Sequence, residues 1–314
     1  MTRVLVTGAA GFIGSHTCET LTARGHETFG IDNFDPYYDQ RLKRTNVELI
    51  EAAGARFREA DIRDAESLAS LMDIVKPEVI IHLAAKAGVR NSEKYPAEYV
   101  RTNLNGSQSV FDAALRNDVE RVVMASTSSV YGATTSVPFT EDQPADSPLQ
   151  PYAASKRAAE ILASTYHSLY GLQTTVTRLF TVYGPRGRPD MMPLLLANSC
   201  RFGTEVPLFE GALARDWTYV GDIVDGLIGA AEHPLGFEIL NLGRGEPVSL
   251  AEFIGEMERI SGTRANLARR DRPRTELLVT YADSSRARDL IGFDPRVSVP
   301  EGVRRLWEWF ESAQ

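Results

Sequence analysis

Cysteine, histidine, basic charge and long apolar runs are all scarce in this 314-residue sequence. Two cysteines, Cys18 and Cys200, cannot build a disulfide framework, and the five histidines lack metal-site spacing. A net charge of −8 would repel a general polyanion such as nucleic acid. No apolar run reaches the ~18 residues of a membrane span, and the N-terminus enters a strand pattern without a signal-peptide stretch. We therefore expect a cytoplasmic protein with no metal, nucleic-acid or membrane partner.

The remaining composition is that of an ordinary globular protein, 43% hydrophobic and 24% charged. Up to about residue 180, short β-branched runs alternate with segments of helical period, which predicts an α/β fold with a doubly wound parallel sheet, the Rossmann arrangement. Beyond that point, loops rich in glycine, proline and arginine separate shorter elements. We expect one domain over residues 1–180 and a smaller C-terminal lobe over 181–314, with short segments free to pass between them.

The pattern places strands and helices in alternation along the first domain. Strands are expected at Val4–Thr7, Thr28–Ile31, Arg56–Glu59, Val79–Leu83, Arg121–Ala125 and Thr174–Arg178, and helices at Ile13–Arg24, Arg41–Ala53, Ala65–Val75, Pro96–Arg116 and Tyr152–Tyr170. Helices in the lobe are expected at Pro193–Phe202, Val220–Ala231, Ser249–Ser261 and Pro300–Glu311. The proline-rich segment Thr134–Pro151 is a long loop, either functional or a plain surface excursion.

Three glycines open the first expected helix directly after the first strand. Gly8, Gly11 and Gly14 have the spacing G-x-x-G-x-x-G, which allows a tight turn and close approach of a pyrophosphate to a helix N-terminus. Asp32 ends the second strand, where a carboxylate can bond a ribose diol and repel a 2′-phosphate. NAD is therefore favoured over NADP, against the alternative of a plain turn and a surface aspartate. Other expected cofactor contacts are Phe12, Ile13, Asn33, Asp61, Ile62, Leu83, Ala84 and Ala85.

Tyr152 and Lys156 stand at i and i+4 of an expected helix, so both side chains can point toward one cleft. A nearby ammonium stabilises a phenolate, which would lower the tyrosine pKa and make the side chain a usable acid or base. The preceding strand delivers the hydroxyls of Ser126–Ser129 from its carboxyl end, where α/β sheets place ligands. The region thus predicts acid–base chemistry beside a dinucleotide.

These motifs occur in the order found in extended short-chain dehydrogenases/reductases, and the chain resembles their nucleotide-sugar epimerases over nearly its whole length. The motifs are Gly8-x-x-Gly11-x-x-Gly14, His82-Leu83-Ala84-Ala85, Ser129-Val130-Tyr131-Gly132, Tyr152-x-x-x-Lys156 and Arg178-Leu179-Phe180-Thr181-Val182-Tyr183-Gly184-Pro185, followed by Arg215–Val220. Three further stretches, Asp32–Asp39, Ala87–Arg90 and Gly187–Met191, are similar to UDP-glucuronate 4-epimerases in particular. Lys86 departs from that pattern, which usually has a neutral polar residue there.

The resemblance implies roles for individual residues. Tyr152 would be the base, Lys156 its electrostatic and ribose partner, and Thr127 the hydroxyl beside the sugar O4. Asn103 would support the active-site network and Phe180 would lie near the nicotinamide. The UDP-sugar contacts implied are Arg215 on a phosphate, Arg90, Ser128, Ser129 and Arg188 around a carboxylate, Thr181, Glu276, and either Arg272 or Arg274. A homodimer is also implied, through the helices near Pro96–Arg116 and Tyr152–Tyr170, whose apolar faces could equally be covered within the chain.

The implied reaction is a redox cycle at C4 of a UDP-hexuronic acid that returns NAD unchanged. UDP-glucose 4-epimerase, UDP-glucuronate decarboxylase and 4,6-dehydratase are the enzymatic alternatives. Decarboxylases tend to carry an acid where Ser129 stands, and dehydratases follow the threonine with Asp-Glu, where this chain has Ser128-Ser129. A catalytically silent NAD-binding regulator is the non-enzymatic alternative, and the presence of Thr127, Tyr152 and Lys156 together weighs against it.

Overall fold

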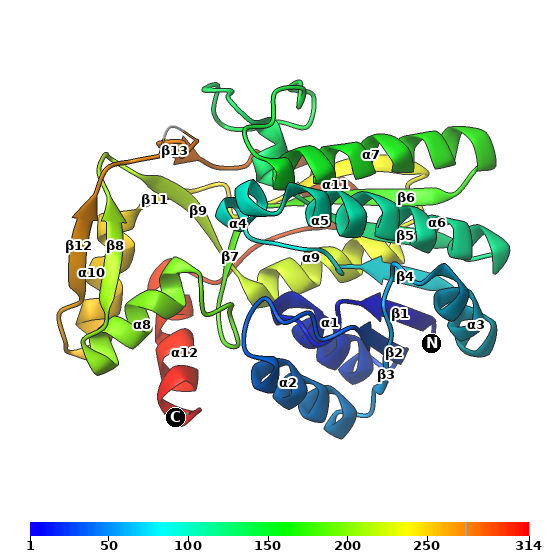
Figure 1. Cartoon of the computed structure of the whole chain (residues 1–314), viewed down its shortest axis with the longest axis horizontal. Helices are drawn as coiled ribbons and strands as arrows, with labels where there is room; N and C mark the ends of the chain where they lie inside the picture. Colours follow the sequence, from blue (N-terminus) through cyan, green and yellow to red (C-terminus); the bar gives the residue numbers. More distant parts are fainter. Residues whose placement is uncertain (274, 314) are drawn as a thin grey trace.

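A seven-stranded parallel sheet forms the centre of the computed structural model, which describes residues 1–273 and 275–313 (Figure 1). Its strands are β1 (Arg3–Thr7), β2 (Glu27–Asp32), β3 (Arg56–Glu59), β4 (Val79–His82), β5 (Arg121–Thr127), β6 (Gln173–Leu179) and β10 (Phe237–Leu242). The order is β10-β6-β5-β4-β1-β2-β3, so the direction of winding reverses between β1 and β4. This confirms the doubly wound α/β fold, and ligands of such sheets bind at that reversal.

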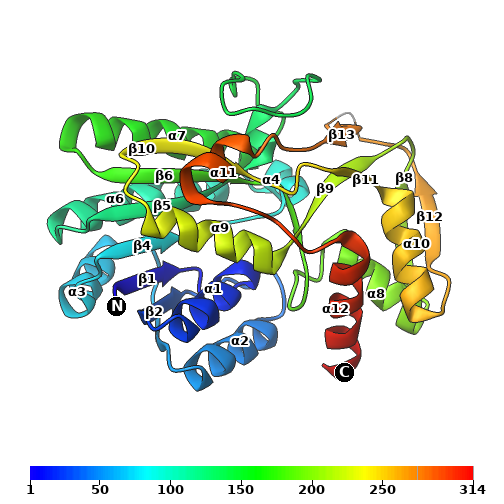
Figure 2. The same cartoon turned by 180° about the vertical axis from the view of Figure 1, so that it is seen from behind.

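Helices cover both faces of the sheet. One face carries α3 (Ala65–Val75), α6 (Gly106–Arg116) and α7 (Pro151–Tyr170), and the other carries α1 (Phe12–Ala23), α2 (Gln40–Ala52), α9 (Val220–Glu232) and α11 (Ser285–Ile291) (Figures 1 and 2). Alternate side chains of one strand enter opposite cores: Leu5 packs on one face, and Val4 and Val6 pack on the other. Burial on both faces explains why the central strands β1 and β4 are apolar runs rather than alternating patterns.

The smaller lobe stands beyond the carboxyl ends of the parallel strands. It contains β7 (Thr181–Tyr183), β8 (Glu205–Phe209), β9 (Ala214–Tyr219), β11 (Pro247–Ser249), β12 (Asn266–Arg270), β13 (Val279–Thr280), α8 (Met192–Phe202), α10 (Leu250–Ser261) and α12 (Val299–Ser312). Strand β9 pairs with β7, β11 and β13, and β12 pairs with β8. A capping box between Ser249 and Glu252 begins α10, because each residue satisfies the other's free backbone amide.

Two features differ from the sequence-based expectation. The single helix expected over Pro96–Arg116 is instead α5 (Pro96–Tyr99), the wider π-helical stretch η1 (Val100–Asn105) and α6, and it is preceded by the unexpected α4 (Val89–Lys94). Strand β10, with α9 and α11, returns from the C-terminal part of the chain to the large sheet. Segments from beyond residue 180 thus complete the large sheet and one of its helical faces, which is the kind of passage between the two parts that the sequence analysis allowed.

Helix α7 is fastened to the sheet by a buried ion pair. The Arg178 guanidinium on β6 donates to both oxygens of Glu160 on α7, at 3.1 Å from Nε and 2.8 Å from Nη2. Ser126 on β5 donates to the same carboxylate, and both partners are about 1% exposed. Because Tyr152 begins the same helix, this pair sets the position of the N-terminal turns of α7 against the end of β5.

Candidate active site

A cleft of about 1130 Å³ lies at the carboxyl ends of the parallel strands, between the sheet and the smaller lobe. That volume exceeds the upper range for one drug-sized ligand and suits a dinucleotide with a second ligand. Its lining includes Gly8, Gly11, Phe12, Ile13, Gly14, Asp32, Asn33, Ile62, Leu83, Ala84, Ala85, Arg90, Thr127, Ser128, Ser129, Tyr152, Lys156, Phe180, Thr181, Arg188, Arg215 and Glu276. Asp61 and Asn103 lie behind the lining, and Arg274 lies outside the described residues.

The glycine turn fits the pyrophosphate of a dinucleotide. Gly8 adopts a positive φ of 73°, and a Cβ there would lie 2.8 Å from the Ala84 amide nitrogen. A Cβ on Gly14 would meet the Gly8 carbonyl oxygen at 2.1 Å, so glycine alone lets α1 approach β1 this closely. Gly11 is the N-cap residue of α1, and in the described structure no side chain there accepts from the first backbone amides of the helix. These amides have no intrahelical acceptor, and they belong to residues that line the cleft.

Asp32 ends β2, and its charge is partly neutralised by a lysine that the sequence analysis did not expect there. Its Oδ1 accepts from the Phe34 amide at 2.8 Å and lies 3.4 Å from Nζ of Lys43, which is buried on α2. Sequence reasoning missed Lys43; the available signal was its place with Asn46 and Ile50 on the buried face of that helix. An ordered carboxylate at this site can still bond a ribose diol, but its repulsion of a 2′-phosphate is partly offset by the ammonium.

Asp61 does not line the cleft, but it holds Asn33, which does. Burial would raise the pKa of Asp61, but hydrogen bonds from Arg63 and Asn33 lower it to about 2. The Asn33 amide donates to it at 2.9 Å, which fixes the turn after β2. Asp61 is therefore an ionised support for the loops that frame the cleft, rather than a lining residue.

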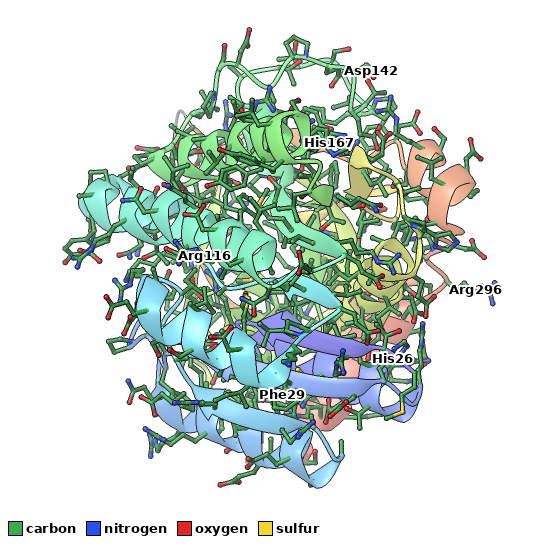
Figure 3. The ribbon with its side chains drawn as sticks, turned by 90° about the vertical axis from the view of Figure 1, so that its right-hand side faces the viewer. His26, Phe29, Arg116, Asp142, His167 and Arg296 are labelled. Carbon is green, nitrogen blue, oxygen red and sulfur yellow. The ribbon has the colours of Figure 1, made fainter. Side chains whose placement is uncertain are left out.

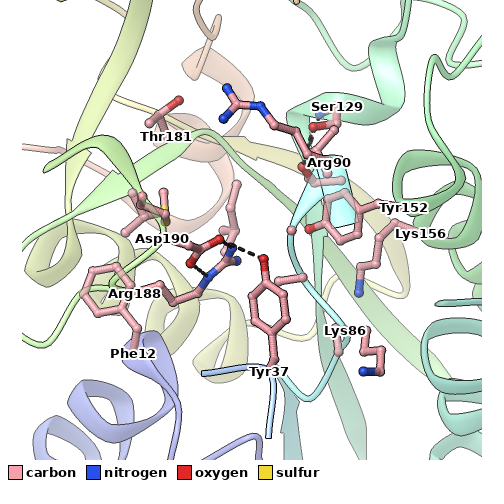
Figure 4. Close-up of a pocket in the computed structure, with 18 of the residues that line it drawn as sticks. Phe12, Tyr37, Lys86, Arg90, Ser129, Tyr152, Lys156, Thr181, Arg188 and Asp190 are labelled. Carbon is pink, nitrogen blue, oxygen red and sulfur yellow. Dashed lines mark hydrogen bonds and ion pairs between the residues drawn. The ribbon is translucent and has the colours of Figure 1, made fainter. Parts of the chain in front are cut away.

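Tyr152, Thr127 and Lys156 come together at the junction of β5 and α7. Burial raises the pKa of Tyr152, whereas a hydrogen bond with Thr127 and the charge of Arg188 lower it. Burial lowers the pKa of Lys156 to about 8, against the opposing charge of Glu160 one turn further along α7. Figure 4 shows the Tyr152 hydroxyl and the Lys156 ammonium, which both belong to residues that line the cleft, ending apart from each other. The expected effect of Lys156 on the tyrosine pKa is thus absent from this arrangement, because the two polar ends do not meet.

A buried chain of hydrogen bonds supports this junction from below. Thr7 and Ser107 bond the two ring nitrogens of His82, at 2.7 and 3.0 Å, and the Ser107 hydroxyl donates to the Asn103 carbonyl. The Asn103 side chain in turn bonds both backbone groups of Lys86 and the Ser155 hydroxyl. Burial, with the charge of Lys156, lowers the pKa of His82 to about 3, so the ring is neutral. Asn103 supports the network, as the resemblance implied, and its polar atoms are engaged by protein.

Two ion pairs face each other across the cleft near Tyr152. Arg188 donates from Nε and Nη2 to the two oxygens of Asp190, at 3.0 and 2.7 Å, and Tyr37 donates to the same carboxylate at 2.8 Å (Figure 4). Lys86, the residue that departs from the resembled pattern, lies 3.2 Å from Asp35. Its charge is thereby balanced within the cleft. Sequence reasoning did not select Tyr37 or Asp190, although both lie in stretches that carried the resemblance.

The far end of the cleft gathers Arg215, Glu276 and Arg90. Arg215 on β9 donates to Glu276 and to the carbonyls of Leu277 and Leu278. Arg90 approaches the other oxygen of Glu276 at 3.7 Å, and its side chain is 63% exposed. Arg215 and Glu276, both predicted contacts of the nucleotide, thus lie together with Arg90, which was predicted at the sugar carboxylate. Ser128 and Ser129 line the cleft beside Thr127, whose hydroxyl donates to that of Ser129 at 3.2 Å.

Within residues 1–273 and 275–313, no group of three or more histidine, cysteine or acidic side chains is placed to hold a metal ion. Figure 3 shows His26 and His167 at separate places on the molecule. Across these same ranges, no helix combines the length and apolar character needed to cross a bilayer.

Comparisons with known proteins indicate the same enzyme family that the sequence motifs resemble. A family model described as "NAD dependent epimerase/dehydratase family" matches residues 4–243. The UDP-glucuronate 4-epimerase of Thermodesulfobacterium geofontis is 41% identical, covering 97% of this chain and 95% of that protein. UDP-glucuronate 4-epimerase 2 of Arabidopsis thaliana is 38% identical, covering 98% and 75% respectively. The crystal structure of the UDP-glucuronic acid 4-epimerase from Bacillus cereus, in complex with UDP-glucuronic acid and NAD, superposes with a TM-score of 0.92 at 33% identity over 99% of both chains.

The Asp32–Lys43 pair yields a prediction about cofactor choice. Asp32→Ala should weaken NAD binding by about ten- to a hundredfold, because a charge-assisted hydrogen bond to the ribose is lost. NADP binding should fall less, since Lys43 is then free to attract a 2′-phosphate. Fluorescence or calorimetric titration of both dinucleotides measures this, with Asp73→Ala on the exposed face of α3 as the control. Equal affinity of the wild-type protein for NAD and NADP would contradict the assignment of Asp32.

Proposed function

Because this chain belongs to the NAD dependent epimerase/dehydratase family, we propose that it inverts C4 of UDP-glucuronate to give UDP-galacturonate through a 4-keto intermediate. One observation carries the proposal. The hydroxyls of Tyr152 and Thr127 line a single cleft together with a dinucleotide-type glycine turn and the Arg188 guanidinium. That arrangement offers a proton acceptor, a place for the cofactor and a cation for an acidic sugar.

Tyr152 carries the proton transfer in this proposal. When bound, NAD supplies the acceptor, and later the donor, of the hydride at C4. Tyr152 removes the O4 proton as the C4 hydrogen leaves, and returns it after the sugar has turned. The Thr127 hydroxyl, which acts to lower the Tyr152 pKa from its place beside that side chain, orients O4 toward it. Lys156 keeps a positive charge beside the cofactor site near neutral pH, because its pKa is about 8.

The turning of the sugar constrains how the substrate is held. The keto intermediate must present its opposite face, so the ring can have few fixed contacts and the UDP must have strong ones. We place Arg215 on a phosphate, toward which its planar fork would turn from Glu276 and the Leu277 and Leu278 carbonyls that hold it here, and Glu276 on the ribose. Both line the cleft. The Phe180 ring, 6% exposed, borders the place proposed for the nicotinamide.

An acidic sugar brings a hazard, because oxidation at C4 produces a β-keto acid. If the C5–carboxylate bond aligns with the carbonyl π system, that bond breaks, CO₂ leaves, and its electron pair forms an enolate that is then protonated at C5. The cleft must therefore fix the carboxylate plane. We place Arg188, Ser128 and Ser129 around it, since guanidinium and hydroxyl groups bond carboxylate oxygens directionally.

We also propose a homodimer that works in the cytoplasm. Ile161 and Leu169 on α7 are 54% and 67% exposed, more than apolar side chains of a lone chain need be, and they form a ready contact for a second copy. Light scattering should give the mass of two chains. The free thiols of Cys18 and Cys200 are both buried and fit a reducing compartment.

The first catalytic prediction concerns Tyr152. Tyr152→Phe should lower kcat for UDP-glucuronate by at least about 10²-fold, the usual contribution of general acid–base catalysis. Epimerisation is followed by NMR of the sugar products, with Tyr281→Phe, outside the cleft lining, as the matched control. Thr127→Val should also move the rising limb of kcat to higher pH, because the hydrogen bond it removes lowers the Tyr152 pKa. A loss below tenfold in Tyr152→Phe would exclude Tyr152 as the base.

The second catalytic prediction concerns Arg188. Arg188→Ala should weaken UDP-glucuronate binding about ten- to a hundredfold and release CO₂ and UDP-pentose, because one charge-assisted contact is lost and Asp190 is left unpaired beside the substrate. Affinity for UDP-glucose should change little. Arg41→Ala, which removes an exposed pair of the same i, i+2 spacing, is the control. Equal weakening toward both sugars without extra CO₂ would dismiss Arg188, and Arg90 would become the next candidate.

A further inference from the structure

Three side chains from two distant loops form one hydrogen-bonded unit at the edge of the cleft, the Tyr37–Asp190–Arg188 clasp. Asp190 occupies the centre: its two oxygens accept from Nε and Nη2 of Arg188, at 3.0 and 2.7 Å. The Tyr37 hydroxyl donates to the second oxygen at 2.8 Å, and the Arg188 guanidinium carbon lies 5.4 Å from the centre of the Tyr37 ring. Tyr37 and Asp190 have no role in the mechanism described so far, yet both line the cleft.

The loop after β2 is built to hold Tyr37 in this place. Side chains of Asn33 and Asp35 accept from backbone amides two residues further on, Asp35 and Tyr37, at 3.0 Å each. On the other side Gly88, with a positive φ of 103°, packs against the tyrosine, where a Cβ would lie 2.4 Å from the hydroxyl oxygen. The position of Tyr37 is therefore determined by the two local turns and by its contact with Gly88.

The clasp leaves Arg188 with one usable edge. A guanidinium has five N–H donors in one plane, and here Asp190 takes those of the Nε and Nη2 edge. Among the described residues, Nη1 of Arg188 has no hydrogen-bond acceptor in the protein. A second carboxylate bound at that edge would lie near the guanidinium plane, whose tilt is set by Asp190 and Tyr37. The orientation of the bound carboxylate is thus determined by residues that never touch it.

Charge balance supports the same reading. The Arg188–Asp190 pair has no net charge, so it attracts a distant anion only weakly. An anion binds when its oxygens meet the N–H groups that Asp190 leaves free on Arg188. A phosphate or carboxylate that approaches at another angle meets Asp190. An unpaired arginine would bind a uronate in several tilts, including those that align the carboxylate bond with the C4 carbonyl.

We propose that Asp190 and Tyr37 are positioning residues that fix the plane of Arg188, and through it the plane of the substrate carboxylate, so that the 4-keto intermediate keeps its CO₂. This inference rests on the proposed function and deepens it. The step that the clasp prevents is the loss of CO₂ already balanced above, which needs no oxidant beyond the cofactor cycle.

The experiment measures the ratio of UDP-pentose plus CO₂ to UDP-galacturonate formed from UDP-glucuronate. Asp190→Asn keeps the size of the side chain but loses a charged acceptor, and we expect the ratio to rise about tenfold or more. Tyr37→Phe leaves every charge in place and removes one of the three hydrogen bonds to the Asp190 carboxylate, so the rise should be smaller, about fivefold. The ratio is measured per turnover and does not depend on how much of the enzyme is folded.

Asp294→Asn is the matched control, because Asp294 forms an i, i+2 pair with Arg296 that lies on the surface away from the cleft (Figure 3). It should leave the ratio unchanged. An unchanged ratio in both clasp variants, while the wild-type enzyme epimerises, overturns the clasp alone. Tighter binding of UDP-glucuronate to Asp190→Asn with an unchanged ratio does the same, since Asp190 would then be a competitor of the substrate. A wild-type protein that forms no UDP-galacturonate overturns the proposed function and this inference with it.

Discussion

A carboxylate and a guanidinium buried beneath the catalytic tyrosine hold the active site together. Glu160 and Arg178 have almost no contact with solvent, and the removal of one partner from such a pair commonly costs about 3–5 kcal/mol. The pair joins α7 to β6, while Ser126 joins the same carboxylate to β5. Since Thr127 follows Ser126 directly and Tyr152 lies in the first turn of α7, the relative position of Thr127 and Tyr152 depends on this single carboxylate.

Charged side chains in the cleft also form ion pairs with one another. Asp32 pairs with Lys43, Asp35 with Lys86, Asp190 with Arg188, and Glu276 with Arg215. Lys43, Lys86, Arg188 and Arg215 all line the cleft, so four of its cations are already placed by carboxylates in a protein of net charge −8. The gain is orientation rather than attraction: a paired arginine or lysine offers its remaining N–H groups in a defined direction, and a ligand binds only where its oxygens meet them.

Spacing along one or two elements was enough to place the glycine turn, the acid that ends β2 and the shared helix of Tyr152 and Lys156, although it did not reveal that the two polar ends stay apart. Lys43 was missed although it is only 11 residues from Asp32, because a lysine in a mostly polar helix was not expected on its buried face. The Tyr37–Asp190 bond was missed because its partners are 153 residues apart. Strand β10 was missed for the same reason, as its pairing with β6 gives no periodic signal of its own.

The long-range contacts that spacing cannot reveal are also those that would separate one nucleotide-sugar enzyme from another on this fold. The proposed roles of the glycine turn, Tyr152 and Thr127 would serve the oxidation of any suitably placed C4 hydroxyl by bound NAD, so these residues do not by themselves decide what happens to a keto acid. In this chain the loop after β2, which frames the cofactor, also holds Asp190 and so the plane of Arg188. The cofactor side and the carboxylate side of the cleft thereby share one rigid loop. A sugar ring that must turn freely can keep its carboxylate only if that loop stays in place while the ring moves.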